Sequence, residues 1–217
     1  MERIEEKYIV EYIRDMINSS RLNKSVDVKD YKYHHNTKYQ DTPSCLTHGI
    51  LSQKELAKLR GEELTNEQLY KLHDDGHVNG SENISLSIPF LDDLYDGEEE
   101  YNPFIASETD ILISKNVKAG RSSNNYGNEF LAKDRISPTE FRSVDFRLLK
   151  YIIEFENNKL SFKSREEAIN NMILYYNSLR LIAEKMKTMD IPLREMSEKN
   201  ITLDIDKVSK NKELILK

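Results

Sequence analysis

Three short stretches carry the side chains best suited to chemistry on a polar substrate. YHHNT (33–37) places two histidines, an asparagine and a threonine at the end of a predicted strand, and ISLS (84–87) places two serines at the head of another. NEFL (128–131) places Glu129 where a polar loop meets a third strand. A fixed carboxylate stabilises positive charge that develops on a substrate during bond breaking. The three stretches therefore predict one polar site, provided that folding brings them together.

Alternating apolar residues bounded by turn residues predict the strands that must position these groups. The expected strands are Tyr31 to His35, 83–90 (NISLSIPF), 110–119 (DILISKNVKA) and 130–137 (FLAKDRIS), followed by a strand that continues as a helix over 144–155 (VDFRLLKYIIEF). The run GRSSNNYGN (120–128) is rich in Gly, Ser and Asn and predicts a mobile loop just before Glu129.

Helical spacing of apolar residues predicts an amphipathic helix over 3–18 and a long one over 164–189, which opens with the capping box of Ser164 and Glu167. TPSCLTHG (42–49) fits a short helix that ends at Gly49. Two further capping boxes, Ser52 with Glu55 and Thr65 with Gln68, predict short helices. The tail from residue 207 fits either a short helix or a frayed end.

These elements predict an α+β fold in one domain, since 217 residues fit the usual size of a single domain. We expect an N-terminal helical element over 1–24, a β-core over 25–148 and a C-terminal helical element over 149–217.

The net charge of −6 argues against a protein that binds phosphates over a broad surface, although a local basic groove remains compatible with it. The single cysteine, Cys45, cannot form an internal disulfide, which favours a reducing compartment. The N-terminus lacks the long apolar run of a signal peptide or membrane span. We expect a cytoplasmic protein as synthesised, with no membrane contact, which a secretion system could still export.

Several of these residues have plainer interpretations. His34 and His35 point to opposite faces of a strand, so one of them can be structural, and the sequence favours His35 for function without deciding between them. Ser85 and Ser87 can be ordinary polar positions of a strand. The stretch LHDDGHVNG offers His73, Asp74, Asp75 and His77 as metal ligands, but Gly76 interrupts the helix that would align them, so we expect no metal site.

The sequence YHHNTKYQDTPSCLTHGILS, followed by ISLS and by YGNEFLAKDRISP, resembles the ADP-ribosyltransferase superfamily, especially its bacterial toxin-like members. The resemblance covers roughly residues 31 to 147 and implies a split, mostly antiparallel β-core that binds NAD as a substrate. It implies catalytic roles for His35, Ser85 and Glu129, and NAD contacts from His35, Asn36, Thr37, Ser85, Ser87 and Tyr126.

In that family the glutamate engages the 2′-hydroxyl of the nicotinamide ribose, and the histidine binds the adenosine-side ribose. The resemblance thus implies a mono-ADP-ribosyltransferase of toxin or effector type. Members that modify arginine carry a second glutamate two residues before the catalytic one, where this chain has Gly127. We therefore expect another macromolecular acceptor, and the acidic charge favours a protein over a nucleic acid.

Two other functions fit the same residues. One is a non-catalytic binding or inhibitor protein on the same fold, which would use its acidic surface against a basic partner. The other is an NAD-dependent transferase acting on nucleic acid, including a phosphotransferase for RNA ends, which would need several basic side chains around a phosphate.

Overall fold

A computed structural model gives the structure of residues 1–62, 65, 82–88, 108–122, 129–157, 159, 164–197 and 200–217. Two of the expected features lie outside these residues: most of the helix expected after Thr65, and the possible metal ligands at 73–77. The fold is mixed, with a mostly antiparallel open sheet and several helices.

Eight strands form the main sheet in the order β11-β10-β9-β5-β2-β4-β7-β6. Their bounds are β2 Tyr31–Lys38, β4 Asn83–Ser87, β5 Glu108–Ser114, β6 Ala119–Arg121, β7 Glu129–Lys133, β9 Phe141–Phe146, β10 Leu193–Glu195 and β11 Ile201–Leu203. All neighbouring strands run antiparallel except β9 and β10, which are parallel.

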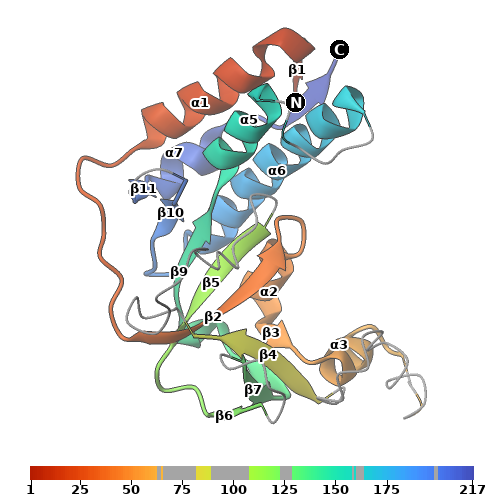
Figure 1. Cartoon of the computed structure of the whole chain (residues 1–217), viewed down its shortest axis with the longest axis vertical. Helices are drawn as coiled ribbons and strands as arrows, with labels where there is room; N and C mark the ends of the chain where they lie inside the picture. The colour runs from red at the N-terminus through yellow and green to blue at the C-terminus, as the bar shows by residue number, and fades with distance from the viewer. Residues whose placement is uncertain are drawn as a thin grey trace.

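The sheet parts between β2 and β4. Strand β2 pairs with β5 from Tyr31 to Lys38, but the register of the described residues joins it to β4 only at His34 and Ser87. Strands β4, β7 and β6 therefore form a small sheet at the end of the molecule opposite the N-terminal and C-terminal helices (Figure 1). At this parting, the backbone and the polar side chains near His34 do not belong to a continuous ladder of hydrogen bonds between strands. They can therefore contribute to a functional site.

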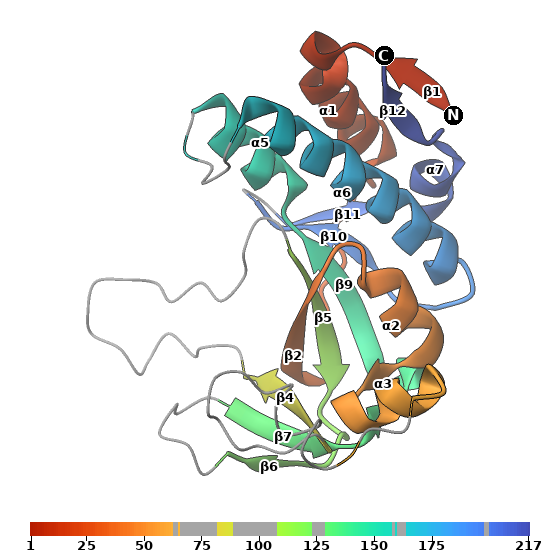
Figure 2. The same ribbon diagram turned by 90° about the vertical axis from the view of Figure 1, so that its right-hand side faces the viewer.

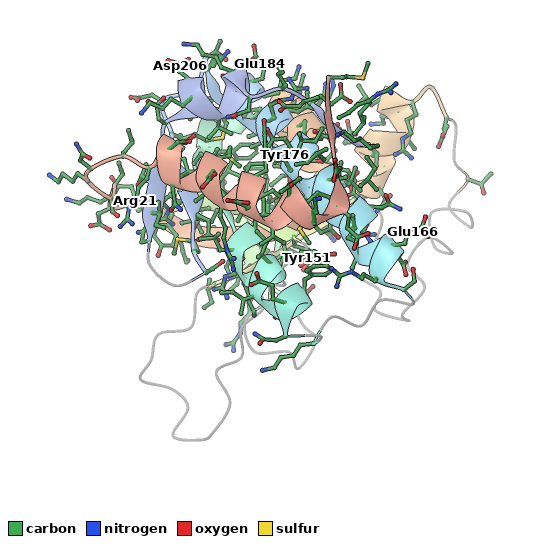
Figure 3. The ribbon with its side chains drawn as sticks, turned by 90° about the horizontal axis from the view of Figure 1, so that it is seen from above. Arg21, Tyr151, Glu166, Tyr176, Glu184 and Asp206 are labelled. Carbon is green, nitrogen blue, oxygen red and sulfur yellow. The ribbon has the colours of Figure 1, made fainter. Side chains whose placement is uncertain are left out.

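A helical layer covers the other end (Figures 1 and 2). It comprises α1 (Ile9–Ser20), α5 (Leu148–Glu156), α6 (Arg165–Met186) and α7 (Ile205–Lys210). The Ser164 hydroxyl accepts a hydrogen bond from the Glu167 N–H at 3.1 Å, which confirms the predicted start of α6. Seen from above, Tyr176 of α6 lies beside α1 (Figure 3), where its ring meets the Tyr12 ring edge-on at 5.7 Å.

The core lies between α6 and one face of the main sheet. The apolar residues of α6 that the spacing predicted are buried, including Ile169, Met172, Leu179 and Met186. Ile111, Val144 and Leu193 occupy paired positions on β5, β9 and β10 and are fully buried. Since each of these side chains contributes about 1.5–3 kcal/mol when fully buried, this layer is the main source of stability.

The two ends of the chain pair with each other, which corrects the helix expected over 3–18. β1 (Glu2–Ile4) runs parallel to β12 (Leu214–Leu216), a single 3-10 turn (Glu6–Tyr8) follows, and the α-helix begins only at Ile9. Ile4 fits the helical spacing, but its strand partner is distant in the sequence and leaves no local signal. The tail forms α7 and β12. Strands β10 and β11 lie within 149–217, which was expected to be a helical element.

Two short helices and a short strand follow β2. α2 (Thr42–His48) ends at Gly49, as predicted, and β3 (Ile50–Leu51) then pairs with β8 (Arg135–Ile136). The Ser52 hydroxyl accepts from the Glu55 N–H at 3.3 Å and starts α3 (Gln53–Leu59). A 3-10 turn at Pro138–Glu140 precedes β9.

Gly49 is required by both its backbone conformation and its surroundings. Its φ is +84° and its ψ is 176°, a region that only glycine occupies readily, and an added Cβ would lie 2.3 Å from the Ile136 carbonyl oxygen. We expect Gly49→Ala to lower the free energy of unfolding by about 2 kcal/mol or more. Denaturant unfolding measures this.

Gly61→Ala is the matched control, because Gly61 also has a positive φ of +71° but an added Cβ would meet nothing within 4 Å. It should show the cost of a positive φ at a position without a close contact. Equal losses in the two variants would contradict the steric part of the explanation.

Candidate functional site

Ser85 and Glu129 meet on the small sheet. In the β4–β7 ladder Ser87 lies opposite Glu129, so Ser85 is the diagonal neighbour of Glu129 on the same face. The Ser85 hydroxyl donates a hydrogen bond to Glu129 Oε1 at 2.7 Å. Ile84 and Leu86 point into the core, while Ser85 is exposed and Glu129 is half-buried. The alternation of β4 thus holds a serine and a carboxylate together at the surface.

His35 joins this pair across the parting of the sheet. Its Nδ1 lies 3.0 Å from the Ser85 backbone oxygen. A carbonyl oxygen can only accept, so Nδ1 must carry the proton in this contact. Burial lowers the pKa of the His35 imidazole, which favours the neutral ring. In this tautomer Nε2 is an acceptor, available to a hydroxyl group of a ligand.

His34 has a different environment. It is only 5% exposed, and its Nδ1 lies 3.1 Å from the carboxylate of Asp110 on β5. Burial lowers the pKa of His34, but the hydrogen bond and charge of Asp110 outweigh this effect and raise the pKa overall. The structure therefore brings His35, rather than His34, to Ser85.

The other predicted contacts are distributed along the same strands. Asn36 and Thr37 follow His35 on β2, where the Thr37 carbonyl accepts a hydrogen bond from the Thr109 hydroxyl at 3.1 Å. Ser87 lies between His34 and Glu129 in the register of the sheet. Tyr126 lies outside the described residues, so its expected contact with NAD stays a prediction.

The two histidines predict opposite pH dependences of stability. The raised folded pKa of His34 gives stabilisation that is complete below the unfolded value of 6.5 and is lost as the pH rises through the folded pKa. The lowered folded pKa of His35 has the reverse effect, a penalty that is absent above 6.5 and grows as the pH falls toward the folded pKa.

We therefore expect the stability of His34→Gln, relative to the unsubstituted chain, to fall between about pH 8 and about pH 5. The relative stability of His35→Gln should rise over the same range. Denaturant unfolding of both variants at each pH measures the difference. If the two variants followed the same pH trend, the assigned environments of the two rings would be wrong.

The sequence did not reveal a row of buried and half-buried charges on the sheet. Asp110 of β5 lies opposite Asp145 of β9, which in turn lies opposite Arg194 of β10. The Arg194 guanidinium binds both oxygens of Asp145, with Nε to Oδ1 at 2.8 Å. The partners are 49 residues apart, so the local sequence shows only an aspartate, Asp145, between the apolar Val144 and Phe146.

A cavity of about 650 Å³ lies beside the Ser85–Glu129 pair on the small sheet. Its lining includes Tyr33, Asn83, Lys118, Gly120, Leu131 and Lys133. Leu131 lies opposite Ser85 and two residues beyond Glu129 on β7, hence on the same face. The candidate site thus consists of a carboxylate, a serine and a histidine next to a basic cavity.

In the described part of the chain, no group of three or more histidine, cysteine or acidic side chains could hold a metal ion. Within the same residues, no helix combines the length and the apolar character that crossing a membrane requires.

Comparison with family models, with curated proteins and with solved structures finds no match to this chain. The functional argument therefore depends on the geometry of the site and on the sequence motifs that led to it.

Proposed function

We propose that the chain is an NAD-dependent mono-ADP-ribosyltransferase of toxin or effector type, a glycosyltransferase that moves a pentosyl group to a macromolecular acceptor. The observation that carries the proposal is the contact chain from His35 Nδ1 to the Ser85 carbonyl and from the Ser85 hydroxyl to Glu129. These are the three positions to which the resemblance assigns catalysis, and they lie on three different strands.

The sheet supports the same proposal. The resemblance implies a split, mostly antiparallel core, and the described sheet is mostly antiparallel and parts between β2 and β4. The three residues lie at this parting, where a dinucleotide would find backbone and side-chain groups from both parts of the sheet.

The proposed reaction breaks the bond between C1′ of the ribose and the nicotinamide nitrogen. The bonding electrons leave with nicotinamide, and positive charge spreads over C1′ and the ring oxygen, as in glycoside cleavage. A nucleophilic atom of the acceptor then supplies a lone pair to C1′ and releases its proton to solvent. The carboxylate of Glu129 would stabilise the positive charge and accept a hydrogen bond from the ribose 2′-hydroxyl.

Ser85 and His35 would position the substrate and the carboxylate. The Ser85 hydroxyl already donates to one oxygen of Glu129, which fixes the carboxylate before NAD binds. His35 holds the Ser85 backbone through Nδ1 and leaves Nε2 as an acceptor for a hydroxyl of the adenosine-side ribose. Asn36, Thr37 and Ser87 would complete the polar lining along β2 and β4.

The first test is release of nicotinamide from NAD by the purified chain, alone and with a cell lysate that supplies acceptors. Labelled NAD in the same lysate identifies the acceptor by mass spectrometry. We expect release that depends on Glu129. Binding of NAD without release under all these conditions would instead favour a non-catalytic binding protein.

A further inference from the structure

The end of the molecule that carries the cavity is locally basic, although the chain as a whole is acidic. Lys118 directly precedes β6, whose first residue Ala119 pairs with Ala132, so Lys118 lies beside Lys133 of β7. Both side chains are exposed and both line the cavity. Neither forms an ion pair with any carboxylate of the described residues.

Two carboxylates near this end pair directly with other lysines, and Glu82 acts on Lys133 only through its charge, beyond ion-pair distance. Asp30 forms an ion pair with Lys115 at 2.5 Å, and Glu82 forms one with Lys54 at 2.6 Å. Two ammonium groups in one cavity, neither in a direct ion pair, repel each other, and an anion bound between them would relieve this repulsion. The cavity is therefore electrostatically suited to a phosphate group.

Protection of a sheet edge does not account for both lysines. Lysines on an edge strand prevent pairing with other molecules, and Lys118 adjoins the edge strand β6. Lys133, however, belongs to β7, which has neighbours on both sides. A charge on that inner strand needs a different explanation.

Aromatic groups accompany the positive charges. Tyr33 lines the cavity but is only 3% exposed, and the Lys32 ammonium lies 5.0 Å from the centre of its ring and 5.4 Å from that of Phe130. Tyr31 is 37% exposed at the start of β2, beside the β5–β6 turn, so it is the ring that a base can reach. Interleaved aromatic and basic side chains are characteristic of surfaces that bind single-stranded nucleic acid, because the rings stack on bases while the cations bind phosphates.

We propose that this cavity binds the phosphate backbone of a single-stranded nucleic acid and so presents an acceptor nucleotide to the ribose held at Glu129. This inference rests on the proposed transferase function, whose acceptor it specifies. Leu131 lines the cavity and lies two residues beyond Glu129 on β7, about 7 Å along the strand. The net charge favours a protein acceptor, but binding depends on the charge at the site, which is positive.

The test compares Lys118→Gln/Lys133→Gln with Lys185→Gln/Lys210→Gln, a control that removes the same charge from exposed lysines of the helical layer. Binding of a fluorescent single-stranded oligonucleotide of about 12 nucleotides is measured by anisotropy over a range of salt concentrations. We expect the cavity variant to bind about tenfold more weakly at low salt and to lower the slope of log affinity against log salt by about 1.4. The control should match the unsubstituted chain.

Two results would overturn the proposal. One is equal affinity and equal salt dependence in the cavity and control variants. The other is tighter binding of a glutamate-rich peptide than of the oligonucleotide, which would identify the cavity as a site for an acidic protein.

A kinetic measurement separates this inference from the proposed function. In the cavity variant, release of nicotinamide to water should keep the KM for NAD of the unsubstituted chain, while transfer to the oligonucleotide falls. A raised KM for NAD would place the NAD diphosphate in the cavity and refute the inference. Absence of nicotinamide release from the unsubstituted chain would refute the transferase function and leave the binding result standing.

Discussion

Glu129→Gln should reduce nicotinamide release and ADP-ribose transfer by about 10²- to 10³-fold, the usual cost of removing one preorganised group that stabilises transition-state charge. The amide oxygen of glutamine can still accept the hydrogen bond that Ser85 donates to Glu129 Oε1. The substitution therefore removes the charge and keeps the local contact. Since Glu129 is half-buried on the small sheet, the fold should be unaffected. Steady-state kinetics and thermal unfolding together measure both effects.

Two further variants make this result specific. Ser85→Ala keeps the charge of Glu129 but removes the donor that orients it, so we expect a smaller reduction of about tenfold. Glu166→Gln alters an exposed carboxylate on α6, in the helical layer (Figure 3), and should have no effect. If folded Glu129→Gln kept the rate of the unsubstituted chain, Glu129 would not be the catalytic carboxylate.

Asp145→Asn should lower the free energy of unfolding by about 3–5 kcal/mol, the cost of leaving one member of a buried ion pair uncompensated. Asp145 and Arg194 are 5% and 6% exposed, and both oxygens of Asp145 bind the guanidinium. Burial raises the pKa of the Asp145 carboxyl even with Arg194 beside it. Without the carboxylate, the cation of Arg194 would remain buried between strands. Denaturant unfolding at neutral pH measures the loss.

Glu156→Gln provides the matched control for this prediction. Arg14 binds both oxygens of Glu156, at 3.0 and 2.6 Å, but the two side chains are 41% and 42% exposed. An exposed pair of the same geometry contributes about 1 kcal/mol or less. Equal losses in Asp145→Asn and Glu156→Gln would show that burial of the Asp145–Arg194 pair has no energetic consequence.

The sequence predicted best the elements whose signals are local. The capping residues Ser52 and Ser164 and the helix-ending Gly49 stand where their short-range patterns placed them. The strand that continues as a helix was also predicted correctly, as β9 and α5. In each case the deciding interactions join residues a few positions apart.

Elements that depend on distant partners were not predicted. β1 and β12 have strand geometry because they pair with each other, and β6 exists because it pairs with β7. β10 lies parallel to β9, although a long helix separates them in the sequence. Periodicity within a short window cannot distinguish such segments from helix ends or loops.

The candidate site was likewise predicted in its local features but not in those that depend on strand pairing. The residue types of His35, Ser85 and Glu129 and their strand positions were evident in the sequence. The choice between His34 and His35 needed the register of β2 with β4, because it depends on which imidazole reaches the Ser85 carbonyl. The basic cavity was missed because Lys118 and Lys133 become neighbours only when β6 pairs with β7.

The pairing of β1 with β12 also constrains the order of folding. Lys217 reaches Glu5 across 212 residues, so this contact closes a loop of that length. The equilibrium cost is modest, since each doubling of loop length adds only about 0.6 kcal/mol. The kinetic consequence is larger, because contacts between distant residues form slowly. During synthesis, β1 must therefore remain without its partner until residues 214–216 have left the ribosome.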